Sequence, residues 1–317
     1  MKIVILDGST LNPGDLSWSI LNKYGEISIY DQTLPYQILE RALPAEILIV
    51  NKVVLSEEIL VQLSRLKYVI VSATGYNNID LLALKKLGIP ASNVVNYGSD
   101  AVAQHTFALI LELCNKVGRH NDLVQQGVWN KQTSFCFWEG KITELYGKTM
   151  GIIGMGSIGQ KVAAIGHAFG MNVIYYSMSK QVVSYKKVTL DELFEQADII
   201  TLHTILHAKN EGLIDKDALR SMKKSAFLIN TSRGKLVNEA DLKHALENDI
   251  IAGAGLDTLS EEPPKEGNIL LGVKNCIITP HNAWAAKETR ERMLEIINQL
   301  IYNYQNKNLI INKINPI

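Results

Sequence analysis

The stretch TMGIIGMGSIGQKVAAIGHAFGMNVIYY, from Thr149 to Tyr176, places two short apolar runs on either side of a helical pattern. The first run, TMGII, and the second, MNVIYY, have the apolar, β-branched and aromatic residues that strands favour. Between them, QKVAAIGHAFG has apolar residues at helical spacing. The stretch therefore predicts a strand, a tight turn, a helix and a second strand, which together form the βαβ unit of a parallel sheet.

The turn in this unit carries Gly154, Gly156 and Gly159 at the spacing G-x-G-x-x-G. A lone match is weak, but a preceding strand and a following helix are the context in which this motif binds a dinucleotide. The first glycine allows the tight turn, the second lets a pyrophosphate approach the backbone, and the third lets helix and strand pack closely. The helix N-terminus also offers N–H groups to phosphate. A glycine-rich turn that binds nothing is the alternative, which this context disfavours.

Strand and helix patterns alternate through the rest of the chain. Strands are expected at KIVIL, EILIV, YVIVSA and GIPASNV before this unit, and at DIITLH, AFLINTS, IAGAGLD and CIITP after it. Such Ile- and Val-rich runs predict parallel sheets covered by helices on both faces. One long helical pattern begins beside the candidate caps Ser99 and Asp100. A last helix is expected from Lys287 to the region of Asn306.

The length of 317 residues is too great for one ordinary domain and suits two. The fold class predicted is α/β, with two Rossmann-like or flavodoxin-like domains, parallel sheets and an active-site cleft between them. We expect residues 1–99 and 285–317 to form a substrate domain, because the last helix has nowhere to pack except on the first unit. Residues 100–284 are expected to form the dinucleotide-binding Rossmann domain.

Charge and cysteine content narrow the class of protein. Lys and Arg together number 32, as do Asp and Glu, so the formal net charge is zero and neither nucleic acid nor a membrane surface is an expected partner. The cysteines Cys114, Cys136 and Cys276 have no metal-ligand spacing, so no metal is predicted, and they suit reduced thiols in a cytoplasmic protein. No apolar run approaches the roughly 18 residues of a membrane span.

Polar residues follow three of the later predicted strands. Arg233 lies in LINTSRGKLV, the pair Glu261 and Glu262 in GAGLDTLSEEPP, and His281 in TPHNAWAA. In an open α/β sheet, ligands bind beyond the carboxyl ends of the strands. Arg can hold a carboxylate through two hydrogen bonds, and His can give a proton to a carbonyl oxygen as a hydride arrives at carbon. These residues favour hydride transfer to a 2-oxo acid, although each also has a plain structural explanation as a cap or a surface charge.

These motifs together resemble the D-isomer-specific 2-hydroxyacid dehydrogenase family, and SATGYNNIDL extends the resemblance into the first unit. The resemblance implies NAD(P)-dependent, reversible reduction of a small 2-oxo acid to a D-2-hydroxy acid. It implies that Arg233, Glu262 and His281 are catalytic, with Glu262 chosen over Glu261 because it precedes the proline. The details FCFW, SEEPP and HNAW are most similar to hydroxypyruvate and glyoxylate reductases, also called glycerate dehydrogenases, which make D-glycerate and glycolate.

The resemblance and the glycine loop also imply the binding residues. The expected cofactor contacts are Thr106, Gly154, Met155, Gly156, Ser157, Ile158, Gly159, Ser177, Lys180, His203, Thr204, Thr231, Ser232 and Asp257. The expected substrate contacts are Asn51, Ala73, Thr74, Gly75, Arg233, His281 and Trp284. Ala73, Thr74 and Gly75 are expected to bind through backbone amides, and Trp284 is equally well explained by ordinary packing.

Two positions depart from the family pattern. Ile205 stands where a proline is common, which puts the shape of that loop in doubt. Ser177 stands where an acid usually holds the adenosine ribose, and such an acid would repel a 2′-phosphate. Ser177 and the nearby Lys180 can instead contact a phosphate, so we expect NADP(H) to be accepted at least as well as NAD(H). An ordinary polar turn, with NAD held by the glycine loop alone, is the alternative.

Two other functions remain open from the sequence. One is an NAD(H)-sensing binding protein of the same fold, similar to the C-terminal-binding transcriptional corepressors, and the other is a 3-phosphoglycerate dehydrogenase. A homodimer is also expected, because the stretch from Trp129 to Tyr146 is apolar, irregular and too long for a plain connection. Such a segment suits an arm that packs on a partner subunit.

Overall fold

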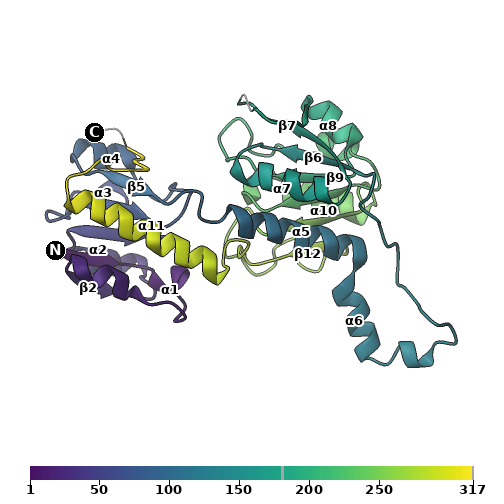
Figure 1. Cartoon of the computed structure of the whole chain (residues 1–317), viewed down its shortest axis with the longest axis horizontal. Coiled ribbons are helices and arrows are strands. Elements are labelled where there is room, and N and C mark those ends of the chain that lie inside the picture. The colour runs from purple at the N-terminus through teal and green to yellow at the C-terminus, as the bar shows by residue number, and fades with distance from the viewer. Residues whose placement is uncertain (180–181, 316–317) are drawn as a thin grey trace. The chain divides into compact units, whose positions relative to one another are not determined.

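The computed structural model describes residues 1–179 and 182–315. The chain folds as two compact units, Met1–Gly98 with Ala285–Ile317, and Ser99–Trp284. Each unit contains one parallel sheet with helices packed on it, which confirms the predicted α/β class (Figure 1). Ser99 was assigned to the first unit from the sequence, but it begins the first helix of the second unit.

The sheet of the first unit has the strand order β2-β1-β3-β4-β5. Its strands are β1 (Lys2–Ile5), β2 (Glu26–Ile29), β3 (Ile47–Val50), β4 (Tyr68–Val71) and β5 (Ala91–Asn93). β3 and β4 are buried along their whole length, which explains why their sequences are continuous apolar runs without polar alternation.

Helices cover both faces of this sheet. They are α1 (Gly8–Leu11), η1 (Trp18–Tyr24), η2 (Pro35–Gln37), α2 (Ile38–Ala42), α3 (Glu57–Leu60), α4 (Leu81–Lys86) and α11 (Lys287–Gln305). α2, α3 and α4 share one apolar cluster with alternate residues of the strands. α11 packs on the opposite face, where Tyr304 stacks on Tyr68 of β4 at 4.7 Å between ring centroids.

The C-terminal segment adds to the edge of this sheet. The side chain of Asn315 accepts a hydrogen bond from the backbone N of Ala91 at 2.7 Å and donates to the carbonyl of Ile89 at 2.8 Å. The Ser92 hydroxyl also donates to the Ile311 carbonyl at 2.9 Å. Residues 311–315 therefore cover the edge of β5.

The sheet of the second unit has the order β12-β11-β10-β9-β6-β7-β8. Its strands are β6 (Thr149–Ile153), β7 (Asn172–Tyr176), β8 (Lys186–Lys187), β9 (Ile199–Leu202), β10 (Phe227–Asn230), β11 (Gly253–Leu256) and β12 (Cys276–Ile278). From β6 the chain first adds β7 and β8 on one side, and then crosses to β9 on the other side. Ligands of open α/β sheets bind at such a switch point, which here lies between β6 and β9.

Two groups of helices cover the faces of this larger sheet. The helices are α5 (Ser99–Asn115), α6 (Val117–Gln125), η3 (Trp129–Lys131), α7 (Ser157–Ala168), α8 (Leu190–Gln196), α9 (Lys216–Ser221), η4 (Gly234–Leu236) and α10 (Glu239–Glu247). α5 and α7 share one apolar cluster with the sheet, and α8, α9 and α10 share another. The strands thus pack between two helical layers.

Two local predictions were wrong. The long helical pattern after residue 99 forms two helices, because Lys116 adopts a left-handed conformation with φ of 54°. Ser99 and Asp100 lie inside α5 instead of capping it, and Asp100 pairs with Lys161.

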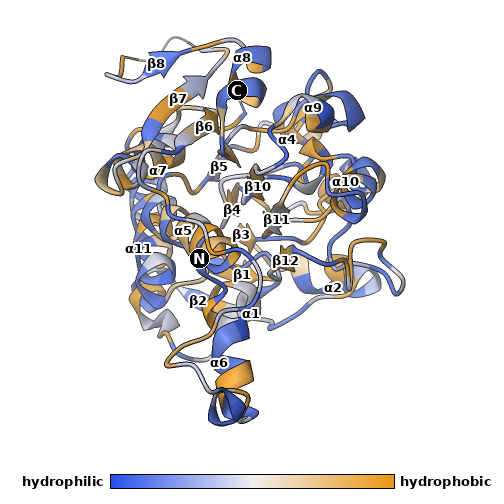
Figure 2. Cartoon of the chain, turned by 90° about the vertical axis from the view of Figure 1, so that its right-hand side faces the viewer, coloured by the Kyte–Doolittle hydropathy of each residue, from blue (hydrophilic) through white to orange (hydrophobic). Residues whose placement is uncertain are grey.

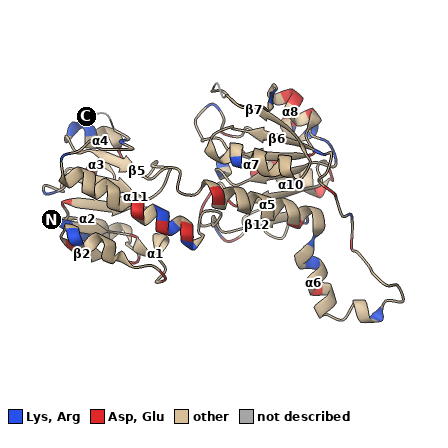
Figure 3. Ribbon diagram, in the orientation of Figure 1, with Lys and Arg blue, Asp and Glu red and all other residues tan. Residues whose placement is uncertain are grey.

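Acidic and basic residues are interspersed along α11, without a block of one sign (Figure 3). No helix in the described ranges is both long and apolar enough to cross a bilayer.

All three cysteines are free. Burial raises the pKa of Cys114 to about 11 and that of Cys276 to about 12, so both of these thiols stay protonated at neutral pH.

Candidate active site

The loops after β10, β11 and β12 bring the predicted catalytic residues to one edge of the second sheet. Arg233 follows β10, Glu262 follows β11 and His281 follows β12, and these strands are neighbours in the order β12-β11-β10. Because all three strands are parallel, their carboxyl ends meet at the same edge. The sheet thus explains how residues distant in sequence become close in space.

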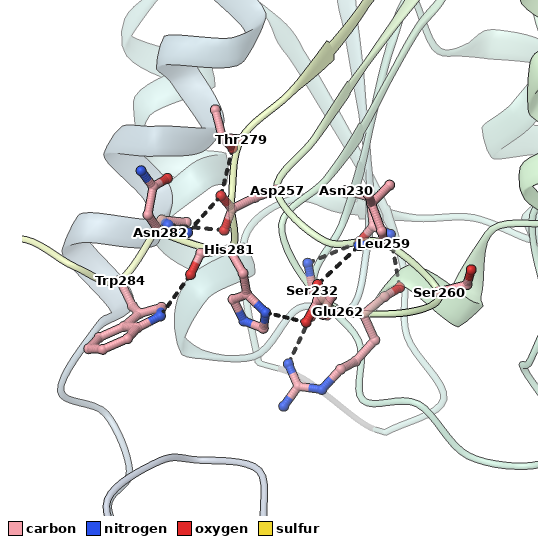
Figure 4. Close-up of polar contacts among 12 residues, drawn as sticks. Asn230, Ser232, Asp257, Leu259, Ser260, Glu262, Thr279, His281, Asn282 and Trp284 are labelled. Atoms are coloured by element: carbon pink, nitrogen blue, oxygen red, sulfur yellow. Dashed lines mark hydrogen bonds and ion pairs between the residues drawn. The ribbon is translucent and has the colours of Figure 1, made fainter. Parts of the chain in front are cut away.

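His281 and Glu262 form a direct pair (Figure 4). The Nδ1 atom of His281 is 2.7 Å from Oε2 of Glu262, and their side chains are 27% and 33% exposed, so a substrate can reach them. Glu261 instead pairs with Lys265 on the surface at 2.7 Å. Since the Glu262 carboxylate accepts a hydrogen bond from the Nδ1–H group, Nε2 is the imidazole nitrogen that remains for a substrate.

Asp257 anchors the turn that carries His281. Its carboxylate accepts hydrogen bonds from the Thr279 hydroxyl at 2.6 Å and from the backbone N atoms of Asn282 and Ala283, both at 3.0 Å. His281 itself has a positive φ of 50°. Asp257 is only 1% exposed, and its carboxylate already accepts these three hydrogen bonds from the protein. Its expected contact with a cofactor stays a prediction.

Trp284 closes the same turn. Its indole N–H donates to the carbonyl of His281 at 3.0 Å (Figure 4). The indole nitrogen is therefore used to hold the histidine backbone. A wall of the substrate pocket is compatible with this arrangement and stays a prediction.

Arg233 lies in a turn that presses against the Glu262 loop. Its Nη1 donates to the Ser232 carbonyl at 2.7 Å, and the side chain is half-buried. A Cβ atom at the next residue, Gly234, would lie 1.9 Å from the carbonyl carbon of Leu259. Only a glycine fits there. The sequence motif TSRG contained this signal, but Gly234 was not among the predicted site residues.

A cavity opens beside these two loops. Its volume is about 270 Å³, and Arg233, Lys235, Thr258 and Glu262 are among the lining residues. Both basic side chains and the acidic one therefore border the same hollow.

The glycine loop has the shape that a pyrophosphate requires. Gly154 has φ of 99°, and a Cβ there would lie 2.3 Å from the His203 carbonyl oxygen, while a Cβ at Gly159 would lie 2.1 Å from the Gly154 carbonyl oxygen. A Cβ at Gly156 would meet nothing within 4 Å. Two glycines thus permit close packing of the protein, and Gly156 leaves open space at the N-terminus of α7, as a dinucleotide site requires.

Side chains around this loop differ in what they offer a cofactor. Met155 is buried in the core, so only its backbone can contribute, while Ser157 and Ile158 begin α7 with Ser157 exposed. Ser177 is 8% exposed and its hydroxyl lies 3.1 Å from that of Ser179. Lys180 lies outside the described residues.

The loops after β9 and β10 are tied to each other and to α5. Thr106 is fully buried, and its hydroxyl donates to the Val102 carbonyl at 2.8 Å and lies 3.1 Å from the Thr231 hydroxyl. The Ser232 hydroxyl donates to the Thr204 carbonyl at 2.6 Å. Four predicted cofactor residues thus belong to this region, with Thr106 supporting Thr231 from behind.

His203 is the fifth predicted cofactor residue of this region. Its Nε2 is buried and has no hydrogen-bond partner among the described residues. Burial lowers the pKa of His203 to about 3, so the ring is neutral at physiological pH. A buried nitrogen without a partner at the switch point of the sheet fits a site that a polar ligand completes.

The first unit carries the predicted carboxylate-binding loop at the ends of β4 and β5. The Ala73 carbonyl accepts from the backbone N of Val94 at 3.2 Å, and the Thr74 carbonyl accepts from Asn93 Nδ2 at 2.7 Å. The loop that includes Gly75 is therefore anchored through carbonyl oxygens. Asn51 is 4% exposed and donates to the Ser72 carbonyl at 2.6 Å, so its side chain braces this loop, and a direct substrate contact stays a prediction.

Comparison with known proteins identifies the family. Residues 107–283 match the D-isomer specific 2-hydroxyacid dehydrogenase, NAD binding domain. A hydroxypyruvate reductase of Blautia hydrogenotrophica is 44% identical over 93% of this chain and 94% of its own length. A glycerate dehydrogenase of Methylorubrum extorquens is 38% identical over 96% of this chain and 95% of its own.

A solved structure extends the likeness to the whole fold. An acyclic imino acid reductase in complex with NADPH and D-Arg is 34% identical, with a TM-score of 0.88 over 99% of this chain and 100% of the other. Sequence and structure thus agree over both units. The chain therefore belongs to the D-isomer specific 2-hydroxyacid dehydrogenases, a family of NAD(P)-dependent oxidoreductases that act on the CH–OH group of 2-hydroxy acids.

Proposed function

We propose that this dehydrogenase reduces hydroxypyruvate or glyoxylate to D-glycerate or glycolate, and catalyses the reverse reaction. The observation that carries the proposal is the pairing of His281 Nδ1 with Glu262 Oε2 at 2.7 Å, next to the turn of Arg233. The relatives named hydroxypyruvate reductase and glycerate dehydrogenase favour these substrates over 3-phosphoglycerate, and favour an enzyme over a binding protein that only senses NAD(H).

Each proposed catalytic residue has one role. His281, protonated and paired with Glu262, gives the proton on Nε2 to the substrate carbonyl oxygen. Arg233 binds the substrate carboxylate, and the backbone amides of Ala73–Gly75 are proposed to bind it as well. The nicotinamide cofactor, held at the glycine loop, supplies the hydride. Glu262 stabilises the imidazolium between turnovers through its negative charge.

We propose that NADPH is accepted at least as well as NADH. Ser177 ends β7 without the carboxylate that would repel a 2′-phosphate, and the Ser179 hydroxyl lies 3.1 Å from its own. A serine hydroxyl at this position, unlike a carboxylate, can donate a hydrogen bond to a phosphate. Lys180 is proposed to add a positive charge, but it lies outside the described residues.

A substrate panel measured with both reduced cofactors tests these two proposals. We expect turnover of hydroxypyruvate or glyoxylate of the order of 1–10³ per second, with phosphorylated acids far slower. Turnover orders of magnitude slower on all small 2-oxo acids would favour the cofactor-sensing alternative. A kcat/KM for NADH more than about tenfold above that for NADPH, or about 1.4 kcal/mol, would reject the cofactor proposal.

Glu262→Gln is expected to lower kcat/KM for reduction by roughly 10- to 100-fold. The amide has no negative charge, so it holds the His281 ring through a weaker hydrogen bond to Nδ1. Glu261→Gln is the matched control, because Glu261 pairs with Lys265 at the surface. The measurement is kcat/KM for hydroxypyruvate reduction by both variants. A loss with Glu261→Gln alone would show that the wrong carboxylate had been assigned.

We propose that the chain forms a homodimer through α6, η3 and residues 132–146. These segments extend away from the sheet of the second unit, and apolar and hydrophilic residues alternate along α6 (Figures 1 and 2). Phe135 is 93% exposed and Trp138 is 64% exposed, a concentration of apolar surface that suits a protein interface.

Sedimentation at micromolar concentration should give twice the mass of 35.2 kDa. The double substitution Phe135→Ser and Trp138→Ser should give a monomer with an unchanged circular dichroism spectrum. A monomeric wild-type protein at this concentration would rule the dimer out.

A further inference from the structure

His105 of α5 contacts the strand end that precedes His281. Its Nε2 lies 2.9 Å from the Thr279 hydroxyl oxygen and 3.5 Å from Oδ1 of Asp257. The His105 side chain is 21% exposed, and the Asp257 side chain is 1% exposed. Residues 105, 257 and 279 come from α5, from the loop after β11 and from the loop after β12, so one contact point connects three elements.

The hydrogen bonds in this group have a fixed direction. A threonine hydroxyl has a single proton, and that of Thr279 is donated to the Asp257 carboxylate at 2.6 Å. The Thr279 oxygen must therefore accept from His105, which requires a proton on Nε2. His105 thus donates to Thr279, and Thr279 donates to the Asp257 carboxylate. Each of these two hydrogen bonds polarises the groups of the other and strengthens it.

Asp257 connects this chain of hydrogen bonds to the turn that carries His281. Its carboxylate also accepts from the backbone N atoms of Asn282 and Ala283, the two residues that follow His281. A buried carboxylate requires all of its donors to remain in place. The direction of the Asp257 carboxylate therefore sets the backbone on which the His281 ring is mounted, at its positive φ of 50°.

We infer that His105 is a positioning residue, which holds the His281 turn in its reactive geometry through Thr279 and Asp257. The inference rests on the proposed role of His281 as the proton donor. A displacement of a reacting group by about 1 Å can lower a rate by roughly 100-fold. His105 touches neither ring nor backbone of His281 in the described contacts, so its loss should lower the rate of proton transfer while leaving cofactor binding intact.

Two substitutions of the same residue separate positioning from packing. Gln places its amide N–H where Nε2 lies in histidine, whereas the shorter Asn places it nearer Nδ1, out of reach of Thr279. We expect His105→Asn to lower kcat by roughly 10- to 100-fold, with KM and Kd for the cofactor within about twofold of wild type. His105→Gln should recover most of kcat. His244→Asn, an exposed site on α10, is the control and should have no effect.

Hydrogen exchange on the protein without cofactor gives a readout that does not depend on turnover. The amides of residues 279–286 should exchange faster in His105→Asn than in wild type, and those of His105→Gln should not. Faster exchange throughout α5 and the sheet, with equal loss of kcat in the Asn and Gln variants, would mean that His105 is merely structural and would overturn the inference.

Thr279 provides a second test at the next hydrogen bond. Thr279→Val keeps the shape and removes the hydroxyl, whereas Thr279→Ser keeps the hydroxyl. If His105→Asn fails to fold, the same kcat loss in Thr279→Val and its recovery in Thr279→Ser support the inference, and equal kcat in both variants rejects it. A different result, a His281→Asn variant that retains activity, would reject the proposed function itself. A silent His105→Asn beside an inactive His281→Asn rejects the positioning role alone.

Discussion

Replacing His281 with Asn is expected to lower kcat by roughly 10²–10⁴-fold, the usual contribution of a positioned acid. The amide cannot deliver a proton to the carbonyl oxygen. The turn itself should survive, because Asn is among the few residues that accept a positive φ, such as the 50° found here. The loss should therefore reflect chemistry and not misfolding.

Steady-state reduction of hydroxypyruvate measures this effect, and fluorescence titration with the reduced cofactor provides the control. Cofactor affinity should stay close to wild type, because the glycine loop follows β6 whereas His281 follows β12. Turnover near the wild-type rate with a correctly folded His281→Asn protein would end the acid–base assignment.

Gly234→Ala is expected to abolish most activity and to destabilise the second unit. The new Cβ would lie 1.9 Å from the Leu259 carbonyl carbon and 2.0 Å from its oxygen. Overpacking usually costs about 1–3 kcal/mol, and this obstacle is backbone, which cannot rotate away as a side chain can. The Arg233 turn must then move from the Glu262 loop, so kcat/KM should fall by roughly 100-fold or more.

Gly156→Ala is a matched control from the same unit. Its Cβ would meet nothing within 4 Å, so the urea midpoint of unfolding should be unchanged. The added methyl group should obstruct the pyrophosphate and so lower the affinity for the cofactor. Urea unfolding and cofactor titration of both variants decide the matter. A Gly234→Ala protein with wild-type stability and kcat/KM would show that the two loops are not held in contact in solution.

The sequence predicted the sheets and the family because apolar runs and glycine spacing are local signals. The stretch from Thr149 to Tyr176 forms β6, α7 and β7 as expected. The break at Lys116 was not predictable, since the helical pattern of apolar residues continues through it and the residue adopts a rare positive φ. β8 has only the two lysines Lys186 and Lys187, which carry no apolar signal for a strand.

The candidate site was predictable in residue type but not in its connections. Glu261 and Glu262 are chemically identical, and what distinguishes them is that Lys265 pairs with the first while Leu259 N and His281 bond the second. The contact of His105 with Thr279 joins residues 174 positions apart. Pattern reasoning along the chain cannot detect such a contact, and for this reason His105 carried no predicted role.

The return of the chain to the first unit through α11 has a consequence for synthesis on the ribosome. The strands β1 to β5 emerge early, but the face under α11 and the edge beside β5 stay uncovered until residues 287–315 leave the exit tunnel. At about 5–20 residues per second, translation of the intervening residues 99–284 takes roughly 10–40 s. The second unit can finish folding in that interval, whereas the nascent first unit waits with apolar surface and a strand edge exposed, the condition that promotes aggregation.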